Sequence, residues 1–108
     1  MTNIVVLWKD NKIFGYKVNG HSGYAESGND IVCSAVSILA YTGINTLIYK
    51  YKYAVDFVIN DGLISLELSE TILEHSEEAQ VILQTIITGF ESIQESYSKY
   101  ITLKNREV

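Results

Sequence analysis

The feature that most constrains the fold is the stretch from Ile31 to Tyr49, which carries no formal charge. Its length is close to the minimum for a membrane span. Small or polar residues interrupt it, and most of them are costly in lipid: Ser34, Ser37, Thr42, Gly43, Asn45 and Thr46. We therefore expect a central helix from about Ile31 to Tyr49, covered by protein on more than one side, rather than a membrane span.

Two predicted β-hairpins flank this helix. Their strands are rich in β-branched and aromatic residues and are separated by short polar turns, of which Asp61-Gly62 is the strongest hairpin signal in the chain. A second helix is expected from about Ser76 to Tyr97, where apolar residues recur three or four positions apart. The four strands are predicted at Ile4–Lys9, Ile13–Asn19, Tyr53–Asn60 and Leu63–Ser69, and the tail Ile101–Leu103 can return as a strand.

The predicted order of elements is β-β-α-β-β-α. Hairpins imply antiparallel pairing, and two helices that cover one face of a sheet give a two-layer α+β domain. The 108 residues are enough for one such domain and too few for two. A hydrophobic content of 47% without any proline is typical of an ordered globular chain and excludes a disordered one.

The charge and the cysteine content restrict the partners and the compartment. With 13 acidic and 8 basic residues, the formal charge is −5, so a phosphate backbone is repelled and nucleic acid is not expected as a direct partner. One cysteine permits no internal disulfide, and the N-terminus lacks the pattern of a signal peptide. We expect a cytoplasmic protein. Two histidines and one cysteine without ligand spacing predict no metal site and no cofactor.

Cys33 is the first candidate for chemistry. Asp30 is a good N-cap residue, and this would place Cys33 at the third position of the helix that follows. In the first turn the helix dipole and the unpaired N–H groups favour a thiolate, and the same groups can stabilise an oxyanion. The alternative is an inert cysteine packed in the core, which is the commoner role of an isolated cysteine.

His21 is the candidate partner of Cys33. It follows Gly20 at the end of a predicted strand, from which an imidazole can reach the start of the next helix across a loop. In that position it can take the thiol proton and return it to a leaving amine. The alternative is an exposed loop histidine. His75 lies in a polar stretch before the second helix and is expected to be solvated.

Two residues near Cys33 have both a structural and a functional interpretation. Asp30 either caps the helix, which stabilises it by about 1 kcal/mol, or orients His21 as a third member of the site. Ser37 lies four residues after Cys33 and shares its helix face. Its hydroxyl either lines the site or bonds back to the carbonyl of Cys33.

The loop between His21 and Cys33 has the composition of a mobile segment. Gly23 and Gly28 would let it fold over a bound peptide and reopen, and Tyr24 supplies an aromatic surface. Glycine is common in loops, so this pattern alone is weakly specific.

The segments Gly20–Ala25 and Asp30–Ser37, with Gly28 between them, closely resemble the signature of the ribosomal-processing cysteine protease family (Prp). The similarity extends along the chain and includes the Asp61-Gly62 turn. Ser22 and Ser34 stand where the family usually has alanine. Both replacements are small, and they leave the assignment of the pair intact while affecting loop packing and substrate preference.

The resemblance implies a function and site roles. Such proteases remove a hydrophobic N-terminal extension from large-subunit ribosomal protein twenty-seven. By position, Cys33 would be the nucleophile, His21 the general base, and Asp30 and Ser37 supporting residues. The segment that includes Ser22, Gly23, Tyr24 and Gly28 would cover the substrate. The family is also homodimeric, which fits an uncharged helix that one small domain cannot easily cover. The alternative function is a non-enzymatic ribosome-associated binding module.

Overall fold

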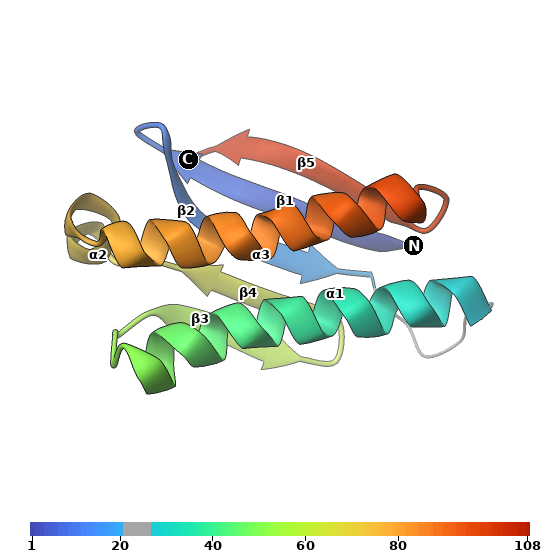
Figure 1. Ribbon diagram of the computed structural model, residues 1–108, viewed down its shortest axis with the longest axis horizontal. Coiled ribbons are helices and arrows are strands. Elements are labelled where there is room, and N and C mark those ends of the chain that lie inside the picture. Colours follow the sequence, from blue (N-terminus) through green and yellow to red (C-terminus); the bar gives the residue numbers. More distant parts are fainter. Residues whose placement is uncertain (21–26) are drawn as a thin grey trace.

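The computed structural model describes residues 1–20 and 27–108, with side chains for 1–20 and 31–108. Five strands form one sheet in the order β3-β4-β2-β1-β5, and the long helices α1 and α3 lie side by side on one face of it (Figure 1). The predicted two-layer α+β architecture is confirmed. The elements are β1 (Thr2–Lys9), β2 (Lys12–Asn19), α1 (Ser27–Asn45), the π-helical turn η1 (Thr46–Lys50), β3 (Asp56–Asn60), β4 (Leu63–Glu67), α2 (Glu70–His75), α3 (Glu77–Ser96) and β5 (Ile101–Glu107).

The sheet is mixed rather than wholly antiparallel. Both predicted hairpins are present, and β2 also pairs with β4 in antiparallel fashion. β5 instead pairs with β1 in parallel, from Thr2 opposite Ile101 to Trp8 opposite Glu107. The tail follows α3, and a helical crossover is the connection that parallel pairing requires. The last strand therefore closes the sheet on the β1 side and leaves β3 and β5 as its edges.

A β-bulge in β2 decides which side chains reach the core. The register jumps from Leu7 opposite Gly15 to Trp8 opposite Ile13, which leaves Phe14 as the extra residue. Ile13 is consequently buried beside Tyr16, while Phe14 is only half-buried. A Cβ at Gly15 would lie 1.8 Å from the Leu66 carbonyl oxygen, so only glycine fits where β2 approaches β4.

The start of α1 corrects the prediction for Asp30. The helix begins at Ser27, so Asp30 is its fourth residue and not the residue that caps it. The difference exceeds the one or two residues by which assignments of helix ends usually vary. Asp30 still lies in the first turn, where the helix dipole favours a carboxylate. The local signal was misleading because Gly28 and Asn29 are poor helix formers, and the helix nevertheless includes them.

Two glycines allow α1 to pack closely on its neighbours. A Cβ at Gly89 of α3 would lie 2.7 Å from Cδ1 of Leu39, which places Leu39 on the side of α1 that meets α3. A Cβ at Gly43 would lie 2.5 Å from the hydroxyl of Tyr16. That hydroxyl donates a hydrogen bond of 2.6 Å to the Ala40 carbonyl, and burial raises the pKa of Tyr16 far above its ordinary value.

The charge-free stretch forms α1 and η1. By length and composition alone, Ile31–Lys50 would suffice to cross a membrane, and about a third of it is buried inside the structure. Val32, Val36, Ala40, Ile44 and Leu47 belong to the core. Ile31, Ile38 and Tyr49 are exposed on the outer side of the helix.

The second predicted helix is confirmed as α3. Ser76 caps it, and its hydroxyl accepts a hydrogen bond of 3.0 Å from the N–H of Ala79. Glu77 and Glu78 lie in the first turn, as the helix dipole prefers. The short helix α2, capped by Ser69, was not predicted.

Candidate active site

Cys33 lies on α1, in a different part of the helix from the one predicted. It is the seventh residue of α1, about 9 Å along the axis from Ser27 at 1.5 Å per residue. Its N–H group is past the four that lack a partner inside the helix. The prediction that Cys33 lies in the first turn is therefore wrong, and the end of the helix dipole contributes little there. The side chain is half-buried and thus partly open to solvent.

Three of the predicted site residues share one side of α1. Asp30, Cys33 and Ser37 are spaced by three and four residues, which brings their backbone positions into line along the helix. Leu39 follows Ser37 by two residues, about 200° around the helix, and packs against Gly89 of α3. The side of α1 that carries Cys33 therefore faces away from α3 and toward the β3 edge of the sheet.

Tyr41 continues this side of α1, although it was not among the predicted site residues. It lies four residues after Ser37 and, like Cys33 and Ser37, is half-buried. Its aromatic ring belongs to the partly buried shell around the core. The spacing of four from Ser37 was the signal in the sequence that could have identified it.

The other predicted site residues lie in or beside the segment before α1. β2 ends at Asn19, as predicted, and Gly20 follows with a positive φ of 82°. His21, Ser22, Gly23 and Tyr24 lie outside the described residues. Gly28, predicted as part of the loop, is instead the second residue of α1.

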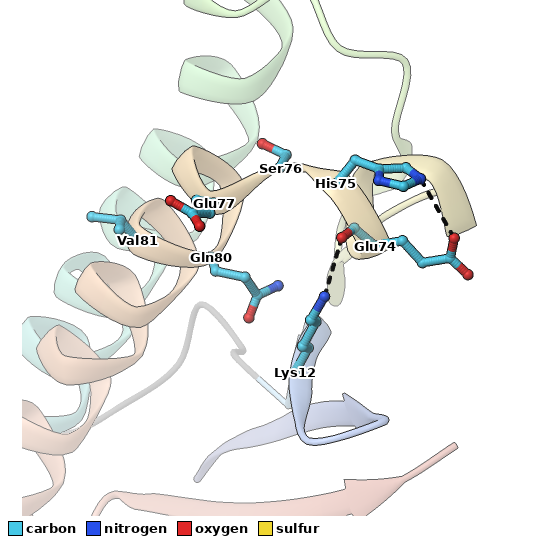
Figure 2. Close-up of a pocket in the computed structure, with 7 residues that line it drawn as sticks. All are labelled: Lys12, Glu74, His75, Ser76, Glu77, Gln80 and Val81. Atoms are coloured by element: carbon cyan, nitrogen blue, oxygen red, sulfur yellow. Dashed lines mark hydrogen bonds and ion pairs between the residues drawn. The ribbon is translucent and has the colours of Figure 1, made fainter.

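A hollow in the described part of the chain lies elsewhere, where α2 meets α3 (Figure 2). It has a volume of about 520 Å³ and contains His75, whose side chain is 74% exposed, so the prediction that His75 is solvated is confirmed. Lys12 donates hydrogen bonds to the carbonyls of Leu73 (3.3 Å) and Glu74 (3.2 Å), the last turn of α2. These contacts hold the β1–β2 hairpin to α2. The hollow is lined by Lys12, Glu74, His75, Ser76, Glu77, Gln80 and Val81.

Comparison with known proteins identifies the family. The family model described as "Cysteine protease Prp" matches residues 1–102. The chain belongs to the Prp family of cysteine proteases. Two proteins named "Ribosomal processing cysteine protease Prp" are similar in sequence. The one from Staphylococcus aureus is 28% identical and covers 87% of this chain and 88% of its own. The one from Bacillus subtilis is 26% identical, and the match covers 82% of this chain and 81% of its own.

Solved structures agree with the Prp fold. The Staphylococcus aureus Prp protease in complex with a substrate peptide superimposes with a TM-score of 0.86 at 27% identity, over 98% of this chain and 100% of that one. A protein from Streptococcus mutans has a TM-score of 0.87 at 23% identity. The superposition covers 100% of this chain and 96% of that one. Membership of the Prp family makes this chain a cysteine protease, a hydrolase of peptide bonds, and disfavours the binding-module alternative.

Proposed function

We propose that this chain removes the N-terminal extension of large-subunit ribosomal protein twenty-seven, with Cys33 as the nucleophile. The names of its relatives and the substrate peptide bound to the Staphylococcus aureus protein support a role in ribosomal protein processing. One observation carries the residue assignment: the chain contains a single cysteine. A cysteine protease attacks through a thiolate, so Cys33 is the residue available for it.

In the proposed reaction, His21 takes the proton from Sγ of Cys33, and the thiolate attacks the carbonyl carbon of the scissile peptide bond. The tetrahedral intermediate collapses, the C–N bond breaks, and His21 returns the proton to the leaving amine. Water then attacks the thioester while His21 takes its proton, and this releases the carboxylate product and regenerates the thiol. A Staphylococcus aureus structure with a covalently linked product peptide supports a covalent intermediate.

The remaining predicted residues take supporting roles in this proposal. Asp30 would orient or balance the charge of His21, and Ser37 would line the site. Their backbone alignment with Cys33 on one side of α1 supports both roles. The segment before α1, with Ser22, Gly23 and Tyr24, would cover the bound peptide. A loop that closes over the substrate excludes water and assembles the site only when the peptide is present.

The nucleophile is tested by incubating each variant with the ribosomal protein precursor and weighing the products by mass spectrometry. Cys33→Ala is expected to leave the precursor intact, because no other thiol can replace Sγ. Ser34→Ala is the control, since Ser34 is the exposed neighbour of Cys33. Cleavage at the same bond by the Cys33→Ala protein would disprove the proposal.

The general base is tested in the same assay by the two histidines. His21→Ala is expected to slow cleavage by about 100- to 10,000-fold, the usual contribution of a positioned acid–base group. His75→Ala is the matched control, because His75 is an exposed residue at the end of α2, and it should cleave at the wild-type rate. Equal rates for the two variants would exclude His21 as the base.

We also propose that the protein is a homodimer joined through the outer side of α1 and η1. This side exposes 54% of Ile31, 64% of Ile38 and 64% of Tyr49, and it lies within the charge-free stretch. Light scattering after gel filtration should give twice the monomer mass. Ile38→Lys should give the monomer, whereas Val81→Lys should not, because Val81 is a similarly exposed residue of α3 (60%). A monomeric wild-type protein would contradict this proposal.

We also propose that the reaction takes place in the cytoplasm. The charge of −5 favours recognition of a basic protein over direct binding of RNA, and we propose no membrane association. Fractionation of cells that express the tagged chain should place it with the soluble proteins. Recovery in the membrane pellet would contradict the assignment.

A further inference from the structure

The chain leaves the sheet at Gly20, the residue before His21, where three strands meet. The end of β2 lies beside the start of β1, and the start of β1 lies beside the start of β5. Asn3 of β1 is opposite Asn19 on one side and opposite Thr102 on the other. Figure 1 shows this corner of the sheet at the same end of the molecule as the first turns of α1.

Gly20 is closely packed against the first residues of the chain. Its φ of 82° lies in the left-handed region that favours glycine. A Cβ at this position would lie 2.6 Å from the carbonyl oxygen of Met1 and 2.9 Å from Nδ2 of Asn3. The Asn3 amide therefore lies directly beside the Cα of Gly20. Because consecutive Cα atoms are about 3.8 Å apart, the position of Gly20 restricts the position of His21.

The side chain of Asn3 is itself held by β5. Its Oδ1 accepts a hydrogen bond of 2.6 Å from the Thr102 hydroxyl, and both side chains are half-buried. The neighbouring Ile4 belongs to the core under the helices. Side chains alternate along a strand, so Asn3 points to the opposite face of the sheet. The amide thus connects β5 to the end of β2 from the face that α1 does not cover.

The two groups of the proposed catalytic pair are held by different parts of the fold. Cys33 belongs to α1, which packs on the sheet and on α3, whereas His21 is joined to the sheet through Gly20. A misplacement of about 1 Å can lower the rate of an enzymatic step about 100-fold. The contacts that hold Gly20 can therefore influence the reaction without touching either group.

We propose that Asn3 is a positioning residue of the protease. Held by Thr102, its amide keeps Gly20 in place, and through Gly20 it sets the point from which the imidazole of His21 reaches Cys33. The inference rests on the proposed function, because it takes His21 as the general base. In this role Asn3 does not touch the substrate. Its loss should therefore lower kcat and leave KM unchanged.

Steady-state cleavage of a fluorogenic peptide that spans the cleavage site of the precursor tests this role. Asn3→Ala should lower kcat by about tenfold, with KM within about twofold of the wild-type value. Thr102→Val keeps the shape of the side chain but removes the hydroxyl, and it should lower kcat by about fivefold. Thr102→Ser keeps the hydroxyl and should retain the wild-type kcat. A loss confined to KM, or equal losses in the two Thr102 variants, would contradict the proposal.

Asn105→Ala is the matched control. Asn105 also joins β1 to β5 through its side chain, because its Oδ1 accepts a hydrogen bond of 2.8 Å from Nε1 of Trp8, but it lies toward the other end of both strands. Urea midpoints of all variants show how much each change costs in stability, and kcat is measured well below the unfolding transition. Asn105→Ala should retain the wild-type kcat. If it lowers kcat as much as Asn3→Ala, or if neither variant does, Asn3 has no positioning role.

A double variant distinguishes this inference from the proposed chemistry. If Asn3 acts only through the general base, Asn3→Ala should cause no further loss of kcat in the His21→Ala protein. A tenfold loss in both backgrounds would refute the positioning role and leave the base standing. Wild-type activity of His21→Ala alone would refute the base, and with it the route by which Asn3 acts.

Discussion

Gly43→Ala should destabilise the protein although alanine is the better helix former. Gly43 is buried in α1, above β2 and beside α3. A Cβ at this position would lie 2.5 Å from the Tyr16 hydroxyl and 3.1 Å from Cγ1 of Ile86. Tyr16 has no exposed surface into which its ring could move. The added methyl group must therefore displace the hydroxyl from the Ala40 carbonyl or push α1 away from the sheet.

The magnitude follows from three contributions to the free energy of unfolding. Replacing glycine by alanine inside a helix adds about 1 kcal/mol. Overpacking a filled core subtracts about 1–3 kcal/mol. Loss of the Tyr16–Ala40 hydrogen bond leaves a buried hydroxyl unpaired, which subtracts about 1–3 kcal/mol more. The net loss is about 1–5 kcal/mol, and each kcal/mol lowers Tm by about 4–8 °C in a domain of this size.

A double-mutant cycle in urea identifies the cause. Tyr16→Phe removes the oxygen that the new methyl group would meet, so Gly43→Ala should cost at least about 1 kcal/mol less in that background. Gly89→Ala is the comparison, because its Cβ would meet the end of the flexible, half-buried Leu39 side chain, which can turn away. If the stability loss of the double variant equals the sum of the losses of Gly43→Ala and Tyr16→Phe within about 0.5 kcal/mol, the steric argument is refuted.

Two further predictions concern single contacts. Gln80→Ala should lower the free energy of unfolding by about 1–3 kcal/mol. The side-chain oxygen of Gln80 accepts a hydrogen bond from the N–H of Ile13 at the bulge (2.9 Å), and its Nε2 donates one to the Ile13 carbonyl (2.8 Å). Exposed Gln84→Ala is the control, and equal urea midpoints would count against this role. Tyr16 keeps its proton when folded, since burial raises its pKa above 10.0, while the unfolded chain loses it above about pH 10. Above about pH 10, this group should therefore lower the free energy of unfolding by about 1.4 kcal/mol per pH unit. The decrease should be shallower in Tyr16→Phe, and identical slopes in the two proteins would contradict this.

The parts of the fold that were predicted correctly depend on local signals. Asp61-Gly62 specifies its hairpin because glycine accepts the turn geometry, and Gly62 indeed has a φ of 149°. Helix α3 follows from its apolar period and the Ser76 cap. The parallel pairing of β5 with β1 joins residues at opposite ends of the chain, and no local pattern encodes it. Helix α2, Glu70–His75, is too short for a period to show.

The candidate site was predictable to the same extent. The spacing of Cys33 and Ser37 places both on one helix side whatever the helix start. The position of that start was not predictable, because weak helix formers at Gly28 and Asn29 concealed the first turn. The direction in which Cys33 faces depends on the contact of Leu39 with Gly89, which the sequence does not reveal.

The position of Cys33 changes the physical account of its reactivity. In a helix that begins at Ser27, the N–H of Cys33 bonds to the carbonyl four residues earlier and is not free to bind an oxyanion. The unpaired N–H groups belong to the first turn, nearer Asp30, whose negative charge opposes a second anion there. The helix end therefore supplies neither the thiolate nor the oxyanion with most of its stabilisation. In the proposed mechanism both depend on groups brought to Cys33 from outside α1: the imidazole of His21 for the proton, and the substrate-covering segment or the bound peptide itself for the geometry. In this proposal the protease stays inactive until a bound peptide completes the site.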